Sequence, residues 1–171
     1  MATQRPWLHC RKTGDSMSMS IQPHLFPMPQ TDNTSDDYWT PTWLFEALGV
    51  EFDLDVACPP GGPPHTPAKA YYTQETDGLT SEWFGNVWMN PPFTNIPPWN
   101  QRFMAHKHGI CLVPTSKSRA FCSLWDDCDA IMRLPYNMKF DQGGIYMPTI
   151  LAAYGEENVE ALHRSKIGRV R

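Results

Sequence analysis

Four consecutive residues near the middle of the chain, Asn90-Pro91-Pro92-Phe93, combine an amide, a stiff backbone and an aromatic ring. The amide oxygen of Asn90 and a neighbouring peptide carbonyl are two hydrogen-bond acceptors, held on a frame that the prolines make rigid. They suit the two N–H bonds of an NH₂ group on a planar ring that stacks on Phe93, with the nitrogen facing an electrophilic methyl group. Taken alone, the four residues are also compatible with an ordinary turn that buries Phe93.

A second candidate site follows Asp55. Residues 52–57 alternate apolar and acidic side chains like a strand and run into Cys58-Pro59-Pro60-Gly61-Gly62-Pro63-Pro64, which has the composition of a loop. The Asp55 carboxylate can accept a hydrogen bond from an ammonium group or a ribose hydroxyl, and the glycines allow a ligand to approach the backbone. Many proteins have a strand followed by such a loop, so this signal is weak by itself.

Short helices and strands are expected to position these two loops. Thr40 is the expected N-cap and Pro41 the first residue of a helix that ends at Gly49. Further helices are expected over residues 98–108 and 118–127, and strands over 87–89, 110–113, 130–132 and 149–154. This alternation predicts a compact single α/β domain with a mostly parallel sheet and an antiparallel strand pair at the C-terminal end. Ligands of such sheets bind at the carboxyl ends of the strands, where both loops lie.

The composition suits one domain of a protein that remains in the cytoplasm. The 171 residues allow one core, which we expect over residues 38–155, with a flexible tail over residues 1–37 and a basic C-terminal tail over residues 156–171. The sequence has no apolar run that would span a membrane, and residues 1–12 lack the apolar core of a secretory signal, so we do not expect export. The five cysteines form no C-x-x-C pair, and His106 and His108 would point apart on a helix, so we expect no metal site.

The net charge is −4, but the charges are unevenly distributed along the chain. Residues 1–96 contain eleven carboxylates and four basic side chains, whereas residues 97–171 contain ten basic and seven acidic side chains. A basic face toward a polyanion such as a nucleic acid is one interpretation, and a solvated surface is an equally good one. The candidate nucleic-acid-binding residues are Arg102, Lys107, Lys117, Arg119 and Lys139.

The order of these motifs resembles the phage-type Dam-like DNA N6-adenine methyltransferases, a compact branch of the Rossmann-like, S-adenosylmethionine-dependent methyltransferases. Trp39-Thr40-Pro41 resembles the first cofactor motif, and Asp55-Val56-Ala57-Cys58 resembles the acidic strand end that opens the cofactor loop. Asp77-Gly78-Leu79 with Trp83 resembles the segment before the catalytic strand, and Asn90-Pro91-Pro92-Phe93 resembles the (D/N)PP(Y/F) catalytic motif. The loop over residues 58–64 departs from the family in being denser in proline.

The resemblance implies a methyl transfer from S-adenosylmethionine to adenine N6. Asn90 and the Pro91 carbonyl would hold the amine, Pro92 would stiffen the loop, and Phe93 would stack on an adenine turned out of the duplex. Cofactor contacts are implied for Trp39, Thr40, Pro41, Asp55, Ala57, Cys58, Asp77 and Asn90. Cytosine N4, RNA, or a non-catalytic nucleic-acid-binding role are the alternatives, and protection of a phage genome from restriction is the biological role that the family suggests. The residues after Phe93 leave no room for a separate recognition domain, so we expect DNA reading by loops within residues 94–101, 115–119 or 136–144.

Overall fold

A computed structural model describes residues 39–136, 138–140, 143–144 and 147–171, so the tail expected over residues 1–37 lies outside the described residues. The first regular element of the described residues is helix α1 (Thr42–Leu48). The helix ends at Gly49, which has the left-handed conformation with φ 59°. The expected N-cap is wrong by one residue. Pro41 is the N-cap residue, and no side chain caps this helix.

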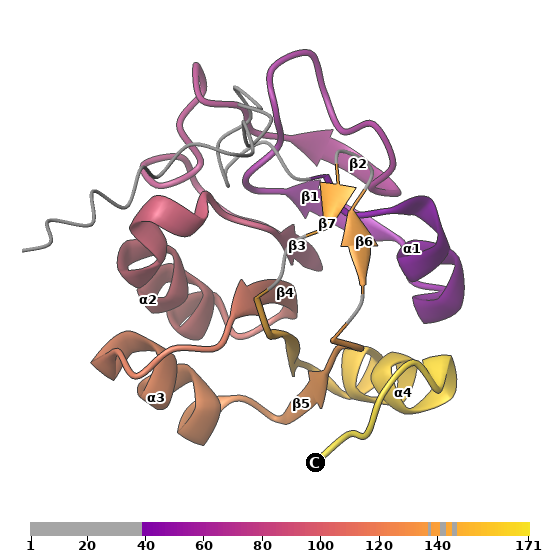
Figure 1. Ribbon diagram of the computed structural model, residues 1–171. Helices are drawn as coiled ribbons and strands as arrows, with labels where there is room; N and C mark the ends of the chain where they lie inside the picture. Colours follow the sequence, from indigo (N-terminus) through magenta and orange to yellow (C-terminus); the bar gives the residue numbers. More distant parts are fainter. Residues whose placement is uncertain (1–38, 137, 141–142, 145–146) are drawn as a thin grey trace, which may run out of the picture. The chain divides into compact units, whose positions relative to one another are not determined.

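A six-stranded sheet forms the centre of the fold (Figure 1). Its spatial order is β2-β1-β3-β4-β8-β5, and the strands are β1 (Phe52–Asp55), β2 (Ala68–Tyr71), β3 (Val87–Met89), β4 (Gly109–Pro114), β5 (Ala130–Arg133) and β8 (Thr149–Tyr154). The neighbouring pairs from β2 to β4 are parallel, whereas β8 runs antiparallel to β4 on one side and to β5 on the other. The predicted Rossmann-like α/β sheet with antiparallel pairing at the C-terminal end is therefore confirmed.

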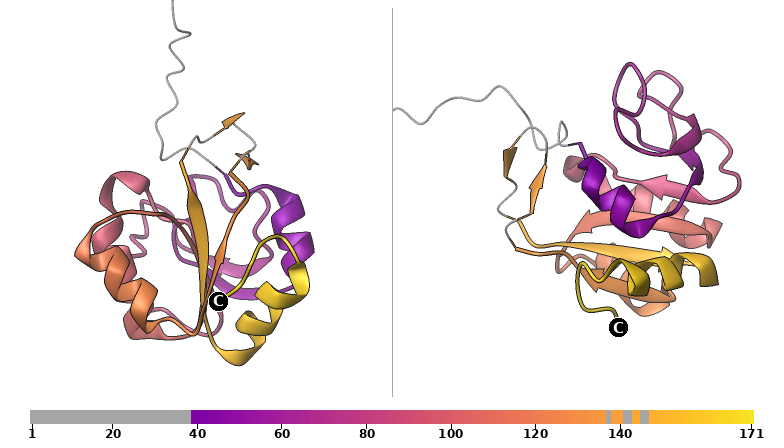
Figure 2. Two further views of the ribbon diagram at one scale, coloured as in Figure 1. Left: turned by 60° about the horizontal axis from the view of Figure 1, so that its bottom comes forward. Right: turned by 90° about the vertical axis from the view of Figure 1, so that its right-hand side faces the viewer.

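Helices cover both faces of this sheet (Figure 2). Helices α2 (Ile96–His106) and α3 (Arg119–Asp127) pack on one face, where Phe103, Phe121 and Leu124 join the buried cluster. Helices α1 and α4 (Glu156–Ser165) pack on the other face. Two short strands, β6 (Lys139–Phe140) and β7 (Gly143–Gly144), pair in a separate antiparallel ribbon.

The segment expected to be a basic tail is largely helical. Its residues 156–165 are α4, in which Asn158, Ala161 and Leu162 are fully buried. The Asn158 amide nitrogen donates to the side-chain oxygen of Asn86 at 2.9 Å, which ties α4 to the loop before β3. Beyond α4, Arg171 exchanges two backbone hydrogen bonds with Ile131 on β5. Residues 156–171 therefore belong to the folded unit.

Two other elements differ from the expectation. Strand β2 was not predicted, because it is a half-exposed edge strand with no run of large apolar residues. Helix α2 begins at Ile96 rather than Pro98, since prolines at the first helical positions lack only N–H groups that have no partner within a helix. Within the described part of the chain, no helix is long and apolar enough to cross a membrane.

Candidate active site

The two loops predicted to be functional meet at one edge of the sheet. Asp55 lies opposite Trp88 in the parallel pairing of β1 and β3, so the loops that follow Asp55 and Met89 leave the sheet side by side. The strand order reverses here, because β1 leads to β2 on one side and β3 leads to β4 on the other. Such a reversal is where open α/β sheets bind ligands.

A cavity of about 500 Å³ lies between these loops. This volume is within the range of small-molecule and cofactor sites. Many of the residues expected at the site line it: Trp39, Thr40, Asp55, Ala57, Cys58, Asp77, Asn90, Pro91, Pro92 and Phe93. Pro41 is the exception, since it is buried at the start of α1 and does not line the cavity.

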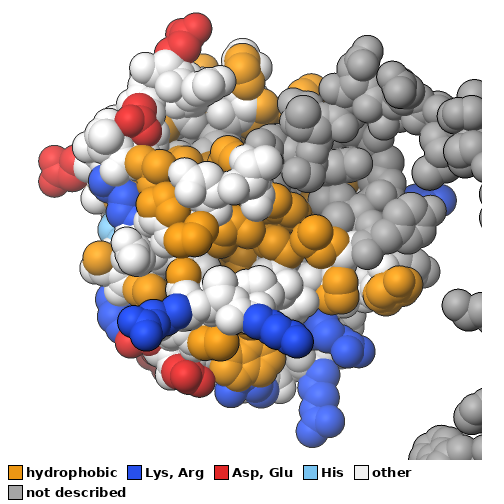
Figure 3. Space-filling view, turned by 60° about the vertical axis from the view of Figure 1, so that its left-hand side comes forward, with side chains coloured by type: hydrophobic (Ala, Val, Ile, Leu, Met, Phe, Trp, Pro, Cys, Tyr) orange, Lys and Arg blue, Asp and Glu red, His pale blue; other side chains and the backbone are white. Residues whose placement is uncertain are grey.

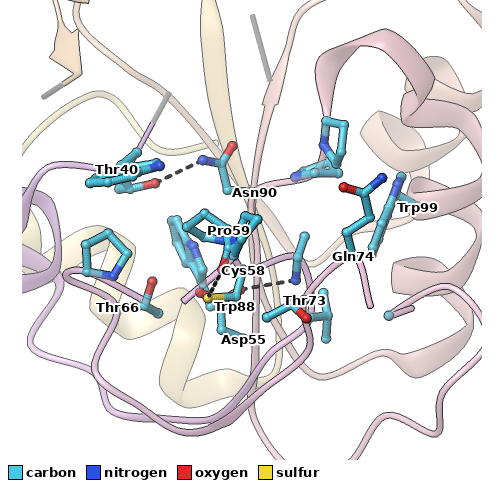
Figure 4. Close-up of a pocket in the computed structure, with 18 of the residues that line it drawn as sticks. Thr40, Asp55, Cys58, Pro59, Thr66, Thr73, Gln74, Trp88, Asn90 and Trp99 are labelled. Carbon is cyan, nitrogen blue, oxygen red and sulfur yellow. Dashed lines mark hydrogen bonds between the residues drawn. The ribbon is translucent and has the colours of Figure 1, made fainter. Parts of the chain in front are cut away.

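Asp55 is a buried carboxylate at one end of the cavity (Figure 4). The Ala57 N–H donates to its Oδ1 at 3.2 Å, and the Thr66 hydroxyl is a second hydrogen-bond partner. Burial nevertheless raises the pKa of Asp55 to about 6. Among the described residues, none of the ion pairs involves Asp55. The carboxylate is therefore suited to a ligand that brings an ammonium or hydroxyl donor.

The loop Asn90-Pro91-Pro92-Phe93, called here the catalytic-type loop, begins where β3 ends. Asn90 is half-buried, and its Nδ2 donates to the Thr40 hydroxyl oxygen at 3.3 Å. Pro91 is buried, whereas Phe93 is half-buried, lines the cavity and begins a short 3₁₀ helix (Phe93–Asn95) that leads into α2. The loop thus carries an amide and an aromatic ring at the cavity wall. The two prolines between them have a fixed φ angle, which stiffens the backbone of the loop.

Asp77 lines the cavity, but its carboxylate organises a turn. Its Oδ1 accepts from the Leu79 N–H at 3.0 Å, and its Oδ2 accepts from the Thr80 hydroxyl at 3.0 Å. The next residue, Gly78, presses against β1's end: a Cβ placed on it would lie 1.9 Å from the Val56 carbonyl oxygen. The Trp83 indole N–H donates to the Gly78 carbonyl at 2.7 Å. The Asp77-Gly78 part of this segment is therefore a tightly packed, hydrogen-bonded part of the cavity wall.

Cys58 has the properties of a packing residue. Its backbone N–H donates to the Tyr72 carbonyl at 2.9 Å, and burial raises the pKa of its thiol to about 12. A thiol with so high a pKa is protonated at neutral pH and is a poor nucleophile. Among the described residues, no group of histidine, cysteine and carboxylate side chains is arranged to hold a metal ion.

Sequence reasoning missed part of the cavity wall, namely Thr66, Thr73, Gln74, Thr94 and Trp99. Thr66 precedes β2, and Thr73 and Gln74 follow it. Recognising β2 would have indicated a third strand end beside Asp55. Trp99 occupies the first turns of α2 and stacks with Trp83 at 6.4 Å between ring centroids.

Two of the candidate DNA-binding residues are engaged within the fold. The Arg102 guanidinium donates to the Leu79 and Ser81 carbonyls and lies 5.1 Å over the Trp83 ring. Lys107 Nζ is 2.6 Å from Asp127 Oδ2 and 4.9 Å from the centre of the Tyr154 ring. Lys107 also lies just before β4 begins, at the edge of the sheet opposite the catalytic-type loop.

The other three candidates are exposed at the carboxyl edge, which is the edge of the sheet where the parallel strands β1, β3 and β4 end. Lys117 and Arg119 follow the end of β4, and Lys139 is the exposed residue of β6. On the side of the molecule seen in Figure 3, lysine and arginine side chains gather along the lower border of a broad apolar area. The structure therefore separates the five candidates into two that have partners within the fold and three that are exposed on the same edge as the cavity.

Comparisons with known proteins identify the family of the chain. The family model for DNA N-6-adenine-methyltransferase (Dam) matches residues 29–135, which is more than half of the chain. A DNA N-6-adenine-methyltransferase of Haemophilus phage HP1 is 35% identical over 75 residues, a match that covers 40% of this chain and 42% of that relative. No solved structure matches the chain. The chain belongs to the DNA N-6-adenine-methyltransferase (Dam) family.

Proposed function

We propose that this protein transfers a methyl group from S-adenosylmethionine to the N6 amino group of adenine in DNA. The observation that carries the proposal is the meeting of the Asp55 loop and the Asn90-Pro91-Pro92-Phe93 loop in one cavity where the strand order reverses. One loop offers a buried carboxylate for a ligand, and the other offers acceptors and a ring for a flat amine.

The residues present fit S-adenosylmethionine. Asp55 is buried, and it forms no ion pair with any of the described residues. Its carboxylate therefore suits the ammonium group or a ribose hydroxyl of that cofactor. Trp39, Thr73 and Gln74 add an aromatic face and polar groups to the same wall. When bound, the cofactor supplies an electrophilic methyl group, and the protein supplies position.

The protein's own residues would act on the target amine. The Asn90 side-chain oxygen and the Pro91 carbonyl accept its two N–H bonds, and Phe93 stacks on the ring. Holding the amine in this way would orient its lone pair for attack on the methyl group of a bound cofactor, so these residues would contribute to the rate through orientation. Adenine N6 is shielded within a stacked duplex, so the base must leave the stack to reach this cavity.

Duplex DNA would be held by charges at the same edge. Lys117, Arg119 and Lys139 are exposed there and would neutralise phosphates. Since Arg102 and Lys107 have hydrogen-bond and ion-pair partners within the fold, we assign the DNA contact to Lys117, Arg119 and Lys139.

The identity of the methylated nucleoside tests this proposal. The protein is incubated with methyl-labelled S-adenosylmethionine and duplex DNA, single-stranded DNA or RNA, and the nucleosides are separated after digestion. We expect label in N6-methyladenine from DNA. Label confined to N4-methylcytosine or to RNA would overturn the substrate assignment. DNA binding without any methyl transfer would instead indicate a non-catalytic member of the family.

A further inference from the structure

The hydroxyl group of Thr40 forms a hydrogen bond with the Asn90 side chain instead of capping helix α1. Threonine before a helix ordinarily caps it, but α1 has no side-chain cap, and the Thr40 oxygen instead accepts from Asn90 Nδ2 at 3.3 Å. Thr40 is only 5% exposed, so few water molecules can compete for this hydroxyl. Figure 4 shows the Asn90 nitrogen turned toward Thr40 and the oxygen turned away from it.

Thr40 lies two residues before helix α1, which packs against β3, the strand that leads to Asn90. Leu44 and Leu48 of α1 are fully buried, and the Phe45 ring packs edge-on against Trp88, with 4.8 Å between centroids. Trp88 lies in β3, two residues before Asn90. A threonine side chain is also stiff at χ1, because its β-carbon is branched. The hydroxyl is thus held at a constant place relative to the Asn90 amide.

We infer that Thr40 is a positioning residue that decides which end of the Asn90 amide faces the target base. This inference rests on the proposed function. An amide has a donor end and an acceptor end, and the two differ only by a flip of the planar group. With the nitrogen bonded to Thr40, the oxygen is the end presented on the other side. That end accepts from a ring-bound NH₂, whereas the flipped amide would favour a ring carbonyl such as O4 of thymine.

Removing the Thr40 hydroxyl while keeping its shape tests the inference. Thr40→Val should lower the methylation rate at saturating cofactor about tenfold, the loss expected for one buried hydrogen bond, and leave the affinity for S-adenosylmethionine within about threefold. Thr40→Ser, which keeps a hydroxyl, should restore most of the lost rate. Thr42→Val makes the same change at an exposed position of α1 and serves as the matched control, with unchanged rate expected.

An Asn90→Asp background separates orientation from simple packing. Both ends of a carboxylate accept hydrogen bonds, so the flip no longer matters, and Asp is an alternative in the family motif. In that background Thr40→Val should cost less than about threefold in rate. The same tenfold loss in both backgrounds, or a parallel loss of cofactor affinity, would overturn the inference.

A readout without turnover keeps this test distinct from that of the proposed function. The Asn90 side-chain NH₂ resonance, identified by its loss in Asn90→Asp, should shift in Thr40→Val and keep its position in Thr42→Val. No shift would overturn the positioning role even in an active enzyme. A wild-type protein that binds cofactor without methylating DNA would overturn the proposed function, while the resonance shift alone would still support the Thr40–Asn90 coupling.

Discussion

Replacement of Asp55 by asparagine should stabilise the protein while weakening cofactor binding. Asparagine keeps an oxygen for the Ala57 N–H, which lies 3.2 Å from Oδ1 in the wild type, and it removes the buried charge. Burial raises the pKa of this carboxyl from 3.8 to about 6. The charged form therefore destabilises the folded state, and an uncharged isostere avoids that destabilisation.

The size of the effect follows from the pKa difference between the folded and unfolded states. A carboxyl with a raised folded pKa binds more protons in the folded state, so its contribution to the free energy of unfolding falls as pH rises from 3.8 to 6 and then levels off. At pH 7.5 the cost amounts to about 3 kcal/mol, and at pH 5 to about half of that. Asp55→Asn should be more stable than the wild type by these amounts.

Urea unfolding of both proteins without cofactor, at pH 5 and pH 7.5, measures this difference. We expect the advantage of Asp55→Asn to grow with pH, while its affinity for S-adenosylmethionine, measured by calorimetry at pH 7.5, falls at least tenfold because a charge-assisted contact is lost. An advantage of the same size at both pH values, or a variant less stable than the wild type, would refute the assignment of Asp55 as a buried carboxylate whose charge destabilises the folded state. Unchanged affinity would move the cofactor site away from Asp55.

Three further predictions follow from the same geometry. Phe93→Leu keeps apolar bulk but removes the ring, so the methylation rate at saturating cofactor should fall about tenfold or more; an unchanged rate would argue against stacking. Lys139→Gln should reduce the slope of log affinity against log salt for duplex DNA by about 1, whereas Lys107→Gln, at the opposite edge, should leave it unchanged; equal effects would contradict the division between the two edges. Gly78→Ala places a Cβ 1.9 Å from the Val56 carbonyl oxygen, so urea unfolding should show a loss of about 1–3 kcal/mol or more; wild-type stability would mean that the loop has room to move.

The central strands and both functional loops could be predicted from local sequence. The strands β3 and β4 are buried along their whole length and appear as short apolar runs, and consecutive prolines mark where β3 must end. The meeting of the loops that follow Asp55 and Met89 at one cavity followed from the general rule that parallel strands place their carboxyl ends at one edge. These features depend on residue types that are close together in the chain.

Other elements depend on contacts that local sequence does not reveal. In α4, the polar residue Asn158 is buried, so the apolar pattern of the helix is weak in the sequence. The Asn158 side chain has a hydrogen-bond partner in Asn86, which lies far away in the chain. Arg102 and Lys107 have the charge of DNA-binding residues, but their partners come from distant segments. Thr40 likewise has its hydrogen-bond partner 50 residues away. Each of these assignments needed the tertiary structure.

The most direct test of the central claim is the rate of N6-methyladenine formation by Asn90→Ala, measured together with its affinity for S-adenosylmethionine. Glu160→Ala, which shortens an exposed side chain of α4 that does not line the cavity, is the control. We predict that Asn90→Ala loses at least about a hundredfold in rate, as expected for a lost transition-state hydrogen bond, with cofactor affinity within a few fold and the control unaffected. A rate close to that of the wild type, or a parallel loss of rate and affinity, would contradict the role given to Asn90.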